Sequence, residues 1–599
     1  MRARGRDREG IGRKTPAFST LALALARLAA LMALFLRKSR ALFGAAAVWT
    51  LASGCYTTGG GGTDPPAQSL YYPVGLAVSQ PAGRWLVVVN SDFDLQYSGG
   101  TLQTFDLAGI RQDAVYTIAY RTNPAAVSCS ATPPTDGWLG LACAQPADAA
   151  PGVYWADPSQ YWRSTLIVGA FATDLLELSV PGLSLDPIPL FSPIRGTTAV
   201  LSATLDPDPD PNAGGGLLTC GDGNVSRCGA GSYVGSDPNA LYDTRQVVLS
   251  GEPFGIAQTH DGTAFLVTSE SDTTTSVFAT DELTDVGTQK LADSGTPIPS
   301  LQFVLSGLPA AGTGIAEIPH DPGTAPTCSP TSGPSCVRPA FLETNHSTAQ
   351  IDLLRYYSDD GTASDGGIQS PGGQRAFLQL EGTLALTATT GSDERGIVID
   401  DSPRAICHAA AQAAEVASGC DANCVSNAQT QDFNCGFLPA NMYVASRTPP
   451  ALLLGQVGNQ YDPDALSIQG TIPLPAGPSR VYRAPVIASD GTYSLRIFVT
   501  CFDSDVVIIY DPATQLWDTV HVGQGPFAMT FDPFPTTCWG KTPAACSQQM
   551  TYPYRFAYVA NFTQSFLEVI DLDNSQPTAQ LTYESVVYAI GQPTAPKGQ

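Results

Sequence analysis

The stretch Pro73–Leu107, PVGLAVSQPAGRWLVVVNSDFDLQYSGGTLQTFDL, contains the pattern that decides the fold. A proline opens a short apolar segment, a Gly-containing turn follows, and the run Trp85–Asn90 is rich in β-branched residues. A polar hairpin then leads into a third segment that ends in Asp-Leu. Short apolar runs bounded by turn residues predict β-strands that are covered on both faces.

The same pattern recurs along the chain, which indicates a repeat architecture. Clear copies begin at Pro253 (PFGIAQTHDG), at Ser479 (SRVYRAPVIASDG) and at Pro526 (PFAMTFDPF). Units of three or four strands that pack against the next unit are typical of propeller blades. We therefore expect an all-β fold, a single β-propeller of seven or eight blades over residues 71–599, with 579–590 supplying the strand that closes the ring. Weaker candidate units begin near Pro124, Arg195, Gly314 and Gly396.

This pattern resembles the YVTN-type β-propeller repeat of extracellular prokaryotic proteins. Val88-Val89-Asn90 and Val559-Ala560-Asn561 stand where that family has its V-x-N core. The resemblance covers four units well and implies an extracellular setting. An irregular pair of β-sandwiches is the alternative architecture that the sequence leaves open.

The first 54 residues predict an export signal. A basic segment with Arg37, Lys38 and Arg40 precedes eleven apolar residues, 41–51, which is the length of a signal peptide. Ala52-Ser53-Gly54-Cys55 then resembles the lipobox of bacterial lipoproteins, although Ala52 stands where that motif usually has Leu. We expect residues 1–54 to be the signal region, with 32–54 as its functional part. An ordinary signal peptide and a short membrane segment at 21–36 are the alternatives.

The resemblance to lipoproteins implies lipidation of Cys55 and a lipid-anchored protein of the cell envelope. Residues 55–70 are rich in Gly, Thr and Pro, which predicts a flexible tether. Tyr56 follows the cysteine where Asp often marks inner-membrane retention, so the outer membrane is favoured over the inner one.

The charge of the chain excludes nucleic acid as a partner. The net charge is -24, and the first 54 residues contribute ten Lys/Arg against two Asp/Glu, so the remainder carries 20 basic and 52 acidic residues, or -32. Such a surface repels phosphate backbones. We expect a monomer that contacts a membrane through its N-terminal lipid and binds an unidentified protein or glycan.

The cysteines fit an oxidising compartment. Thirteen of the 14 follow Cys55, and most form local couples in loops, which predicts disulfides in an exported chain. A metal site made of the four cysteines at 407–435, or of three of them with His408, is the alternative, and their connectivity stays open. Cys501 is left over as a buried free thiol. The predicted disulfide cysteines are Cys129 with Cys143, Cys220 with Cys228, Cys328 with Cys336, Cys538 with Cys546, and the group Cys407, Cys420, Cys424 and Cys435.

One helical insertion is expected near 403–419. The segment 404–418, RAICHAAAQAAEVAS, is Ala-rich and contains neither Gly nor Pro, which favours a helix.

Candidate channel and metal residues are few. The chain has five His and shows no CxxCH, GxSxG or Walker A stretch, which speaks against covalent haem, a serine-hydrolase elbow or a nucleotide loop. The spacing Asp206-x-Asp208-x-Asp210 resembles the opening of a calcium loop, but Leu217 stands where an EF-type loop needs Glu. A solvated acidic loop is the alternative there. Candidates for the central channel are His260, Asp261, His320, Asp321, Asn90 and Asn561.

These observations predict a binding or scaffold module of the cell envelope without an identifiable catalytic site. Two alternatives remain at this point. One is a metal-dependent, lactonase-like hydrolase that uses the central channel, and the other is a surface-layer or adhesion component.

Overall fold

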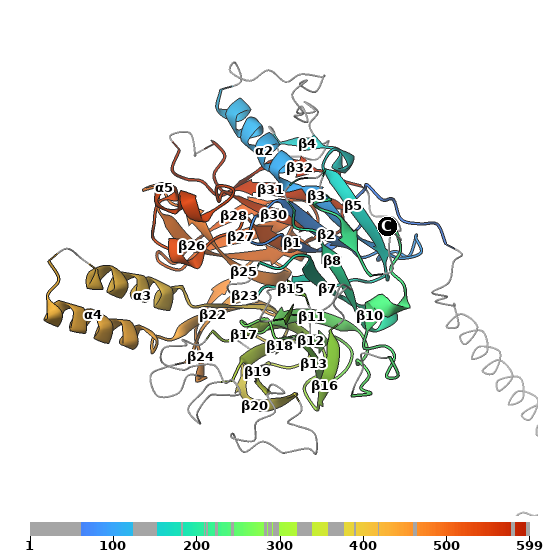
Figure 1. Ribbon diagram of the computed structural model, residues 1–599, viewed down its shortest axis with the longest axis horizontal. Coiled ribbons are helices and arrows are strands. Elements are labelled where there is room, and N and C mark those ends of the chain that lie inside the picture. The colour runs from blue at the N-terminus through green and yellow to red at the C-terminus, as the bar shows by residue number, and fades with distance from the viewer. Residues whose placement is uncertain are drawn as a thin grey trace, which may run out of the picture. The chain divides into compact units, whose positions relative to one another are not determined.

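Seven sheets, antiparallel except for one strand pair, follow one another along the chain of this computed structural model (Figure 1). Each sheet has four or five strands, and the sheets form the seven blades of a β-propeller. The predicted all-β propeller is confirmed, and the number of blades is seven. The structure describes residues 62–123, 153–180, 184–208, 210, 212, 214–221, 226–240, 245–280, 284–285, 290–291, 299–319, 338–357, 376–387, 391–416, 419–458, 464–576 and 581–594.

The strands of each blade run from the innermost to the outermost, and almost always in chain order. Blade 1 consists of β1 (Pro73–Val78), β2 (Trp85–Asn90), β3 (Gly100–Asp106) and β5 (Trp162–Val168), and blade 2 consists of β6 (Leu176–Glu177), β7 (Ile188–Ile194) and β8 (Ala199–Leu205) with β9 (Leu218–Thr219) and β10 (Tyr233–Val234). Blade 3 consists of β11 (Pro253–Gln258), β12 (Ala264–Ser269), β13 (Thr274–Ala279) and β16 (Ser300–Ser306). Blade 4 consists of β17 (Gly312–Glu317), β18 (Ala340–Asn345), β19 (Gln350–Tyr357) and β20 (Phe377–Ala385). Blade 5 consists of β21 (Glu394–Asp400), β22 (Ala440–Arg447), β23 (Pro450–Val457) and β24 (Leu466–Pro473). Blade 6 consists of β25 (Pro478–Ile487), β26 (Tyr493–Cys501), β27 (Val506–Asp511) and β28 (Leu516–His521). Blade 7 consists of β29 (Pro526–Phe531), β30 (Phe556–Asn561), β31 (Phe566–Asp571) and β32 (Ser585–Ile590).

Among the described residues, four α-helices and one short hairpin interrupt this order. They are α2 (Leu107–Thr122), α3 (Ser402–Glu415), α4 (Ala422–Cys435), α5 (Pro543–Cys546) and the hairpin of β14 (Thr284–Asp285) and β15 (Lys290–Leu291). Among the described residues, no helix is long and apolar enough to cross a membrane.

Glycine lets the innermost strands approach one another around the axis. A Cβ atom on Gly255 of β11 would lie 2.4 Å from the Thr313 carbonyl oxygen of β17. A Cβ atom on Gly314 of β17 would lie 2.7 Å from the Arg395 carbonyl oxygen of β21. Real Cβ atoms do not come this close to a backbone oxygen, so glycine is needed at these two positions because the neighbouring strand occupies the space of a side chain. Blade 6 has Arg480 at the same position of the repeat.

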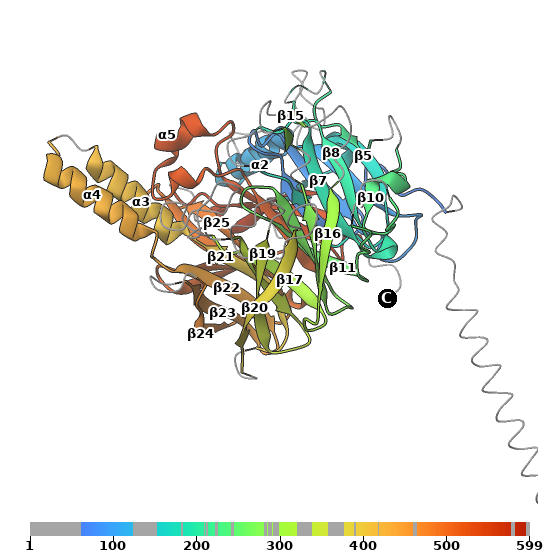
Figure 2. The ribbon, with the colours of Figure 1, turned by 60° about the horizontal axis from the view of Figure 1, so that its bottom comes forward.

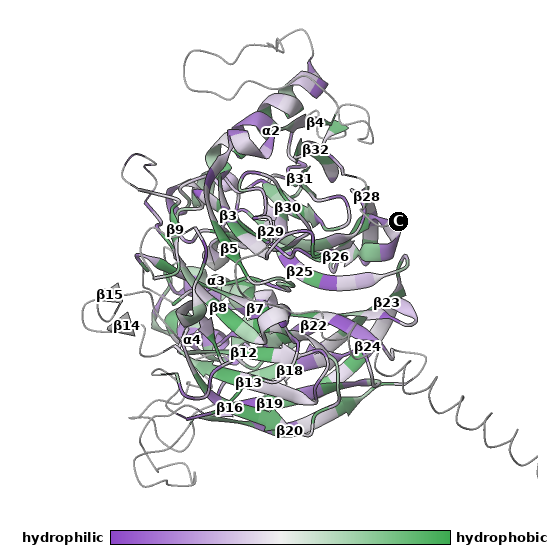
Figure 3. Ribbon diagram, turned by 90° about the vertical axis from the view of Figure 1, so that its right-hand side faces the viewer, coloured by the Kyte–Doolittle hydropathy of each residue, from purple (hydrophilic) through white to green (hydrophobic). Residues whose placement is uncertain are grey.

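Large apolar side chains fill the space between blades. Phe191 of blade 2 stacks on Phe265 of blade 3 with ring centroids 4.7 Å apart, and Phe265 stacks on Phe278 at 4.9 Å. All three rings are fully buried. The apolar runs are thus covered on both faces, which is why they show no clean alternation with polar residues. Figure 3 shows hydrophobic segments on strands such as β8, β13 and β16.

The ring closes between blades 1 and 7. Strand β1 lies beside β29. The insertion between β3 and β5 contains α2 and β4 (Tyr154–Ala156), and β4 pairs in parallel with β32 as a fifth strand of blade 7. The segment predicted to close the ring, 579–590, therefore contributes β32 to the sheet of blade 7. The strand that closes the ring is β4, which comes from the insertion in blade 1.

Two of the weaker candidate units are not blades. The unit expected to begin near Pro124 would include β5, but β5 is the outermost strand of blade 1. Arg195 begins the turn between β7 and β8 within blade 2. The insertion in blade 1 and the irregular first strand of blade 2 obscured the period there. The units expected near Gly314 and Gly396 are confirmed as blades 4 and 5.

The predicted helix is α3, and it pairs with a second helix that the sequence analysis missed. Together α3 and α4 interrupt blade 5 between β21 and β22 and extend away from the sheets (Figures 1 and 2). Four disulfides lie among the described residues: Cys220–Cys228, Cys407–Cys435, Cys420–Cys424 and Cys538–Cys546. Cys501 is free and buried. The couples Cys129/Cys143 and Cys328/Cys336 lie outside the described residues.

Candidate functional site

A β-bulge recurs at the start of the innermost strands, and the side chains at the bulges line a pocket. The strand register shifts at Thr313, Arg395, Ser479 and Phe527. A bulge re-aims a side chain relative to its strand. These four side chains line a cavity of about 370 Å³ at the centre of the ring, which we call the channel pocket.

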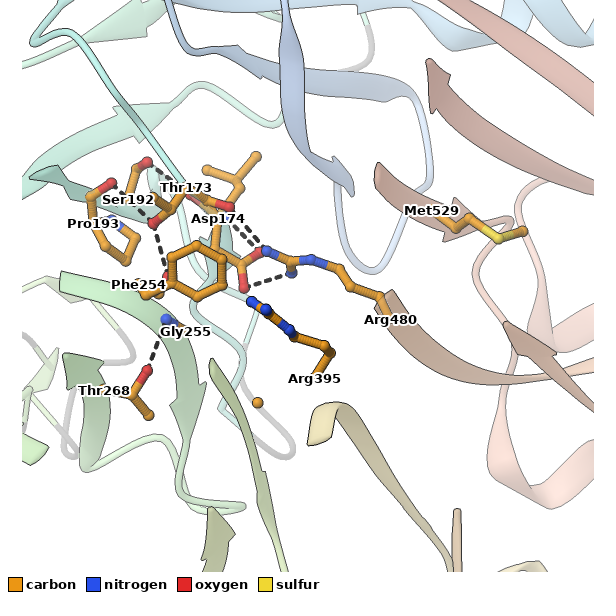
Figure 4. A network of polar contacts seen from close by, with 12 residues as sticks. Thr173, Asp174, Ser192, Pro193, Phe254, Gly255, Thr268, Arg395, Arg480 and Met529 are labelled. Atoms are coloured by element: carbon orange, nitrogen blue, oxygen red, sulfur yellow. Dashed lines mark hydrogen bonds and ion pairs between the residues drawn. The ribbon is translucent and has the colours of Figure 1, made fainter. Parts of the chain in front are cut away.

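Arg480 and Asp174 form an ion pair in the channel pocket (Figure 4). The Arg480 Nη1 atom lies 2.7 Å from Asp174 Oδ2, and Nη2 donates to the Thr173 carbonyl oxygen at 2.8 Å. The guanidinium also lies over the Phe527 ring, 4.8 Å from its centroid. Burial alone would lower the pKa of Arg480, but the Asp174 carboxylate raises it overall, so the side chain stays charged.

Two further arginines of the pocket are also held by carboxylates. Arg395 Nε donates to Asp393 Oδ1 at 2.6 Å, and its guanidinium points toward Asp174 (Figure 4). Arg447 is paired with Asp503 across blades 5 and 6. Each of the three guanidiniums therefore has a carboxylate partner, and these ion pairs add no net charge to the pocket.

We call the face where the innermost strands begin the entry face, and one position of the repeat recurs around it. In each blade, the first residue pairs with a residue of the second strand, as Pro73 pairs with Asn90 and Pro526 with Asn561. The position is the residue that directly follows this partner. In blades 2 to 5 it is charged or imidazole, and in blades 6 and 7 it is aromatic. The residues from blade 2 to blade 7 are Arg195, Glu270, His346, Arg447, Phe502 and Phe562.

Aromatic rings cover one side of the entry face, from blade 6 to blade 2. Phe562 lies 5.9 Å from Phe527, 6.0 Å from Phe502 and 5.4 Å from Phe93, measured between ring centroids. Phe93 is 54% exposed and reaches Phe171 at 6.0 Å. We call these five rings the aromatic arc. Its members Phe502 and Phe527 also line the channel pocket, so the arc is continuous with the cavity.

Ion pairs cover the other side of the entry face, which we call the ion-paired arc. Arg195 of blade 2 binds Glu252 at 3.0 Å and Glu270 at 2.7 Å, both in blade 3. His346 of blade 4 lies 3.9 Å from Glu270. Burial, with the positive charge of Arg395, lowers the pKa of His346, so this imidazole is neutral at pH 7. The Arg395 and Arg447 pairs complete the arc.

The predicted channel residues His260 and Asp261 lie in the turn after β11, at the end opposite the entry face. His260 Nδ1 is 2.9 Å from Glu317 Oε1, and this hydrogen bond raises the pKa of His260. Asp261 accepts from the Thr263 backbone N–H at 3.0 Å, so it stabilises its own turn. His320 and Asp321 lie outside the described residues.

Asn90 and Asn561 lie inside their blades and not in the channel pocket. Asn90 Nδ2 donates to Gln103 Oε1 at 2.8 Å, and Asn561 Nδ2 donates to Glu568 Oε2 at 2.9 Å. Asn90 Oδ1 also accepts from the Tyr71 backbone N–H at 3.0 Å. The Asn90 side chain thus satisfies backbone and neighbouring groups at the end of the second strand of its blade, and Asn561 binds Glu568 within its own blade.

The candidate calcium loop binds its own backbone. Asp206, Asp208 and Asp210 each accept the backbone N–H two residues further along, at 2.8–2.9 Å. Within the described part of the chain, no group of three or more His, Cys, Asp or Glu side chains is placed to hold a metal ion.

The residues of the channel pocket were missed from the sequence, although a signal for them exists. Phe254, Arg395 and Phe527 share the second position of the repeat unit, in PFG, ERG and PFA. Aligning the units on their first residue would have grouped these side chains. The alignment could not have placed Asp174, because blade 2 lacks a regular first strand of the repeat type.

The fold is assigned from the sheets of this chain, because comparisons with known proteins find only distant similarity. No protein-family model and no curated protein matches the sequence. Similar solved structures include a "putative 6-phosphogluconolactonase" from Bacteroides uniformis, which is 12% identical with a TM-score of 0.37 and covers 76% of this chain and 86% of its own. A protein from Lactobacillus plantarum is 11% identical, with a TM-score of 0.37 and coverage of 76% and 86%. Sqt1 from Chaetomium thermophilum is 10% identical, with a TM-score of 0.35 and coverage of 81% and 78%.

Proposed function

We propose that this protein is a binding module of the cell envelope that captures a ligand at the entry face of its propeller. The channel pocket carries this proposal, because side chains from several blades converge on one cavity that continues into an exposed aromatic surface. Small-molecule sites are concave, combine apolar walls with a few polar groups, and start at about 300 Å³. A cavity of about 370 Å³ meets this description at its lower end.

The contacts in the pocket favour binding over hydrolysis. A lactonase-like site needs carboxylates that are free to hold a metal or to accept a proton. Here Asp174, Asp393 and Asp503 each bind an arginine side chain. The neutral His346 contacts Glu270 at the rim and does not line the cavity.

Ligand-induced stabilisation of the full chain, kept in detergent micelles, tests the binding function. A panel of neutral oligosaccharides, carboxylates and phosphates is added at about 10 mM each, and the Tm is recorded. We expect at least one compound to raise the Tm in a dose-dependent way. The rise should disappear in Phe254→Ala and Arg395→Gln and persist in Leu516→Ala, which lies on the outermost strand of blade 6. If no compound raises the Tm, the binding function is wrong.

We further propose that lipid on Cys55 holds this module at a membrane, with the outer membrane favoured. The motif Ala52-Ser53-Gly54-Cys55 and the following Gly-rich segment support this part of the proposal. Cys55→Ser should move the protein from the membrane fraction to the soluble fraction and abolish the incorporation of labelled palmitate. Unchanged fractionation and labelling in the variant would contradict the anchor.

A further inference from the structure

The entry face is divided by chemistry into two halves. The aromatic arc extends over blades 6, 7, 1 and 2, and the ion-paired arc extends over blades 2 to 5. Both arcs border the channel pocket, because Phe502 and Phe527 line it on one side and Arg395 and Arg447 on the other. A ligand in this pocket therefore meets apolar ring surfaces on one side and hydrogen-bonding groups on the other.

The ion pairs of Arg395, Arg447 and Arg480 present both donors and acceptors to the channel pocket without net charge. Arg480 is held by Asp174 and by the Thr173 carbonyl, and Arg395 is held by Asp393. An anion would have to compete with these carboxylates for the guanidiniums, at a cost in ion pairing. A hydroxyl group donates and accepts at once, so it can bind beside an arginine and its carboxylate and contact both without breaking the pair.

The aromatic arc supplies surface for the apolar side of such a ligand. Phe93 leaves 54% of its surface exposed although it contacts Phe171 and Phe562. Isolated exposed rings need no explanation, but connected rings beside a cavity mark a binding surface. Aromatic rings bury a large area when an apolar surface packs on them.

Sugar rings combine these two properties, because their C–H faces are apolar and their edges carry hydroxyl groups. Resting on the binding function proposed above, we propose that the ligand is an uncharged oligosaccharide. One terminal sugar enters the channel pocket between the ion pairs of Arg395 and Arg480. The following sugars pack on Phe562 and Phe93.

Calorimetric titration of the full chain in detergent micelles with defined probes tests this inference. The neutral probes are maltotriose, cellotriose and chitotriose, and the anionic probes are trigalacturonate and inorganic phosphate. Each titration is made at about 0.02 M and about 0.5 M salt, because screening weakens contacts of charged ligands and leaves uncharged ones nearly unchanged. We expect a neutral trisaccharide to bind with a Kd that changes less than about twofold between the two salt concentrations.

Two variants locate the contact. Phe93→Ala removes a ring of the aromatic arc and should weaken binding about tenfold. Phe433→Ala is the matched control, since Phe433 on α4 is also 54% exposed and lies on the helical insertion of blade 5. It should leave the Kd unchanged. Equal affinities of the two variants would overturn the placement of the ligand on the arc.

The outcomes separate this inference from the binding function. Binding of an anionic probe alone, with a Kd that rises steeply with salt, would overturn the saccharide and leave the binding function intact. Absence of binding by every probe, together with an unchanged Tm over the whole panel, would contradict both.

Discussion

The two insertions with long helices, α2 and α3–α4, are held in opposite ways. Helix α2 of blade 1 is packed into the joint where the ring closes, with Ile110, Ala114 and Thr117 among its buried residues. The α3–α4 pair of blade 5 buries few residues and is bound to itself by Cys407–Cys435. Its side chains Val416 and Phe433 are 82% and 54% exposed. An insertion can thus become part of the core or remain an appendage, depending on how much of it is buried against the blades.

Buried polar contacts fasten α2 to blade 7. Arg111 Nε donates to Asp532 Oδ1 at 2.8 Å, and Tyr558 donates to the same oxygen at 2.9 Å. Asp113 accepts from Tyr161, which lies 2.7 Å from the Tyr588 hydroxyl. Polar groups at this depth are costly without partners, so these contacts specify where the helix docks.

The largest expected effect comes from breaking the buried ion pair of α2. Arg111→Met leaves the Asp532 charge buried without its cation and should lower the free energy of unfolding by about 3–5 kcal/mol. Chemical denaturation measures this loss. The counterpart in the other insertion is Arg404→Met in α3, because Arg404 donates to the carbonyl oxygens of Leu438 and Pro319. Among the described residues, no buried carboxylate loses its counter-ion there, so the loss should be smaller, about 1.5–3 kcal/mol. A larger loss for Arg404→Met would reverse the comparison.

An intermediate effect is expected from the titration of Asp113. Burial raises the pKa of Asp113 to about 6 in the folded chain, above its ordinary value near 3.8. The folded state therefore binds the proton more tightly, and stability falls as the pH rises from about 4 to about 6. Asp113→Asn should remove about 3 kcal/mol of this dependence, as read from denaturation at several pH values.

The matched control for Asp113 lies on the other insertion. Asp432 of α4 is 39% exposed and pairs with His408. Asp432→Asn should change stability by less than about 0.5 kcal/mol, since exposed ion pairs contribute little. A pH dependence that persists in Asp113→Asn would show that other groups produce it.

The smallest effect on the propeller is expected from the disulfides of the α3–α4 insertion. Loop-closure entropy predicts about 3.5 kcal/mol of local stabilisation for Cys407–Cys435 and about 2 kcal/mol for Cys420–Cys424, which close loops of 28 and 4 residues. The double variant Cys407→Ser with Cys435→Ser should therefore speed amide exchange in α3 and α4 more than Cys420→Ser with Cys424→Ser does. The Tm of the propeller should stay the same in both double variants. A lower Tm in both of them would show that the insertion supports the ring.

The same contrast explains which helices the sequence revealed. Helix α3 was predicted because its composition favours a helix regardless of its neighbours. Helix α2 was missed because its buried face includes Arg111, Asp113 and Thr117, so polarity does not mark the side that packs. Figure 3 shows hydrophilic residues along α2. Only the partners on blade 7 make that face a buried one.

The sequence by itself determined the strands, the repeat and hence the propeller, because short apolar runs and turn residues act locally and recur in each unit. It also marked the couples Cys220/Cys228 and Cys538/Cys546 and the thiol of Cys501. The tertiary structure decided the blade count, the closing strand β4 and the channel pocket. The pocket joins Asp174 to Arg480, which lie 306 positions apart in the chain. Ring closure brings them together, and neither local propensity nor spacing records that contact.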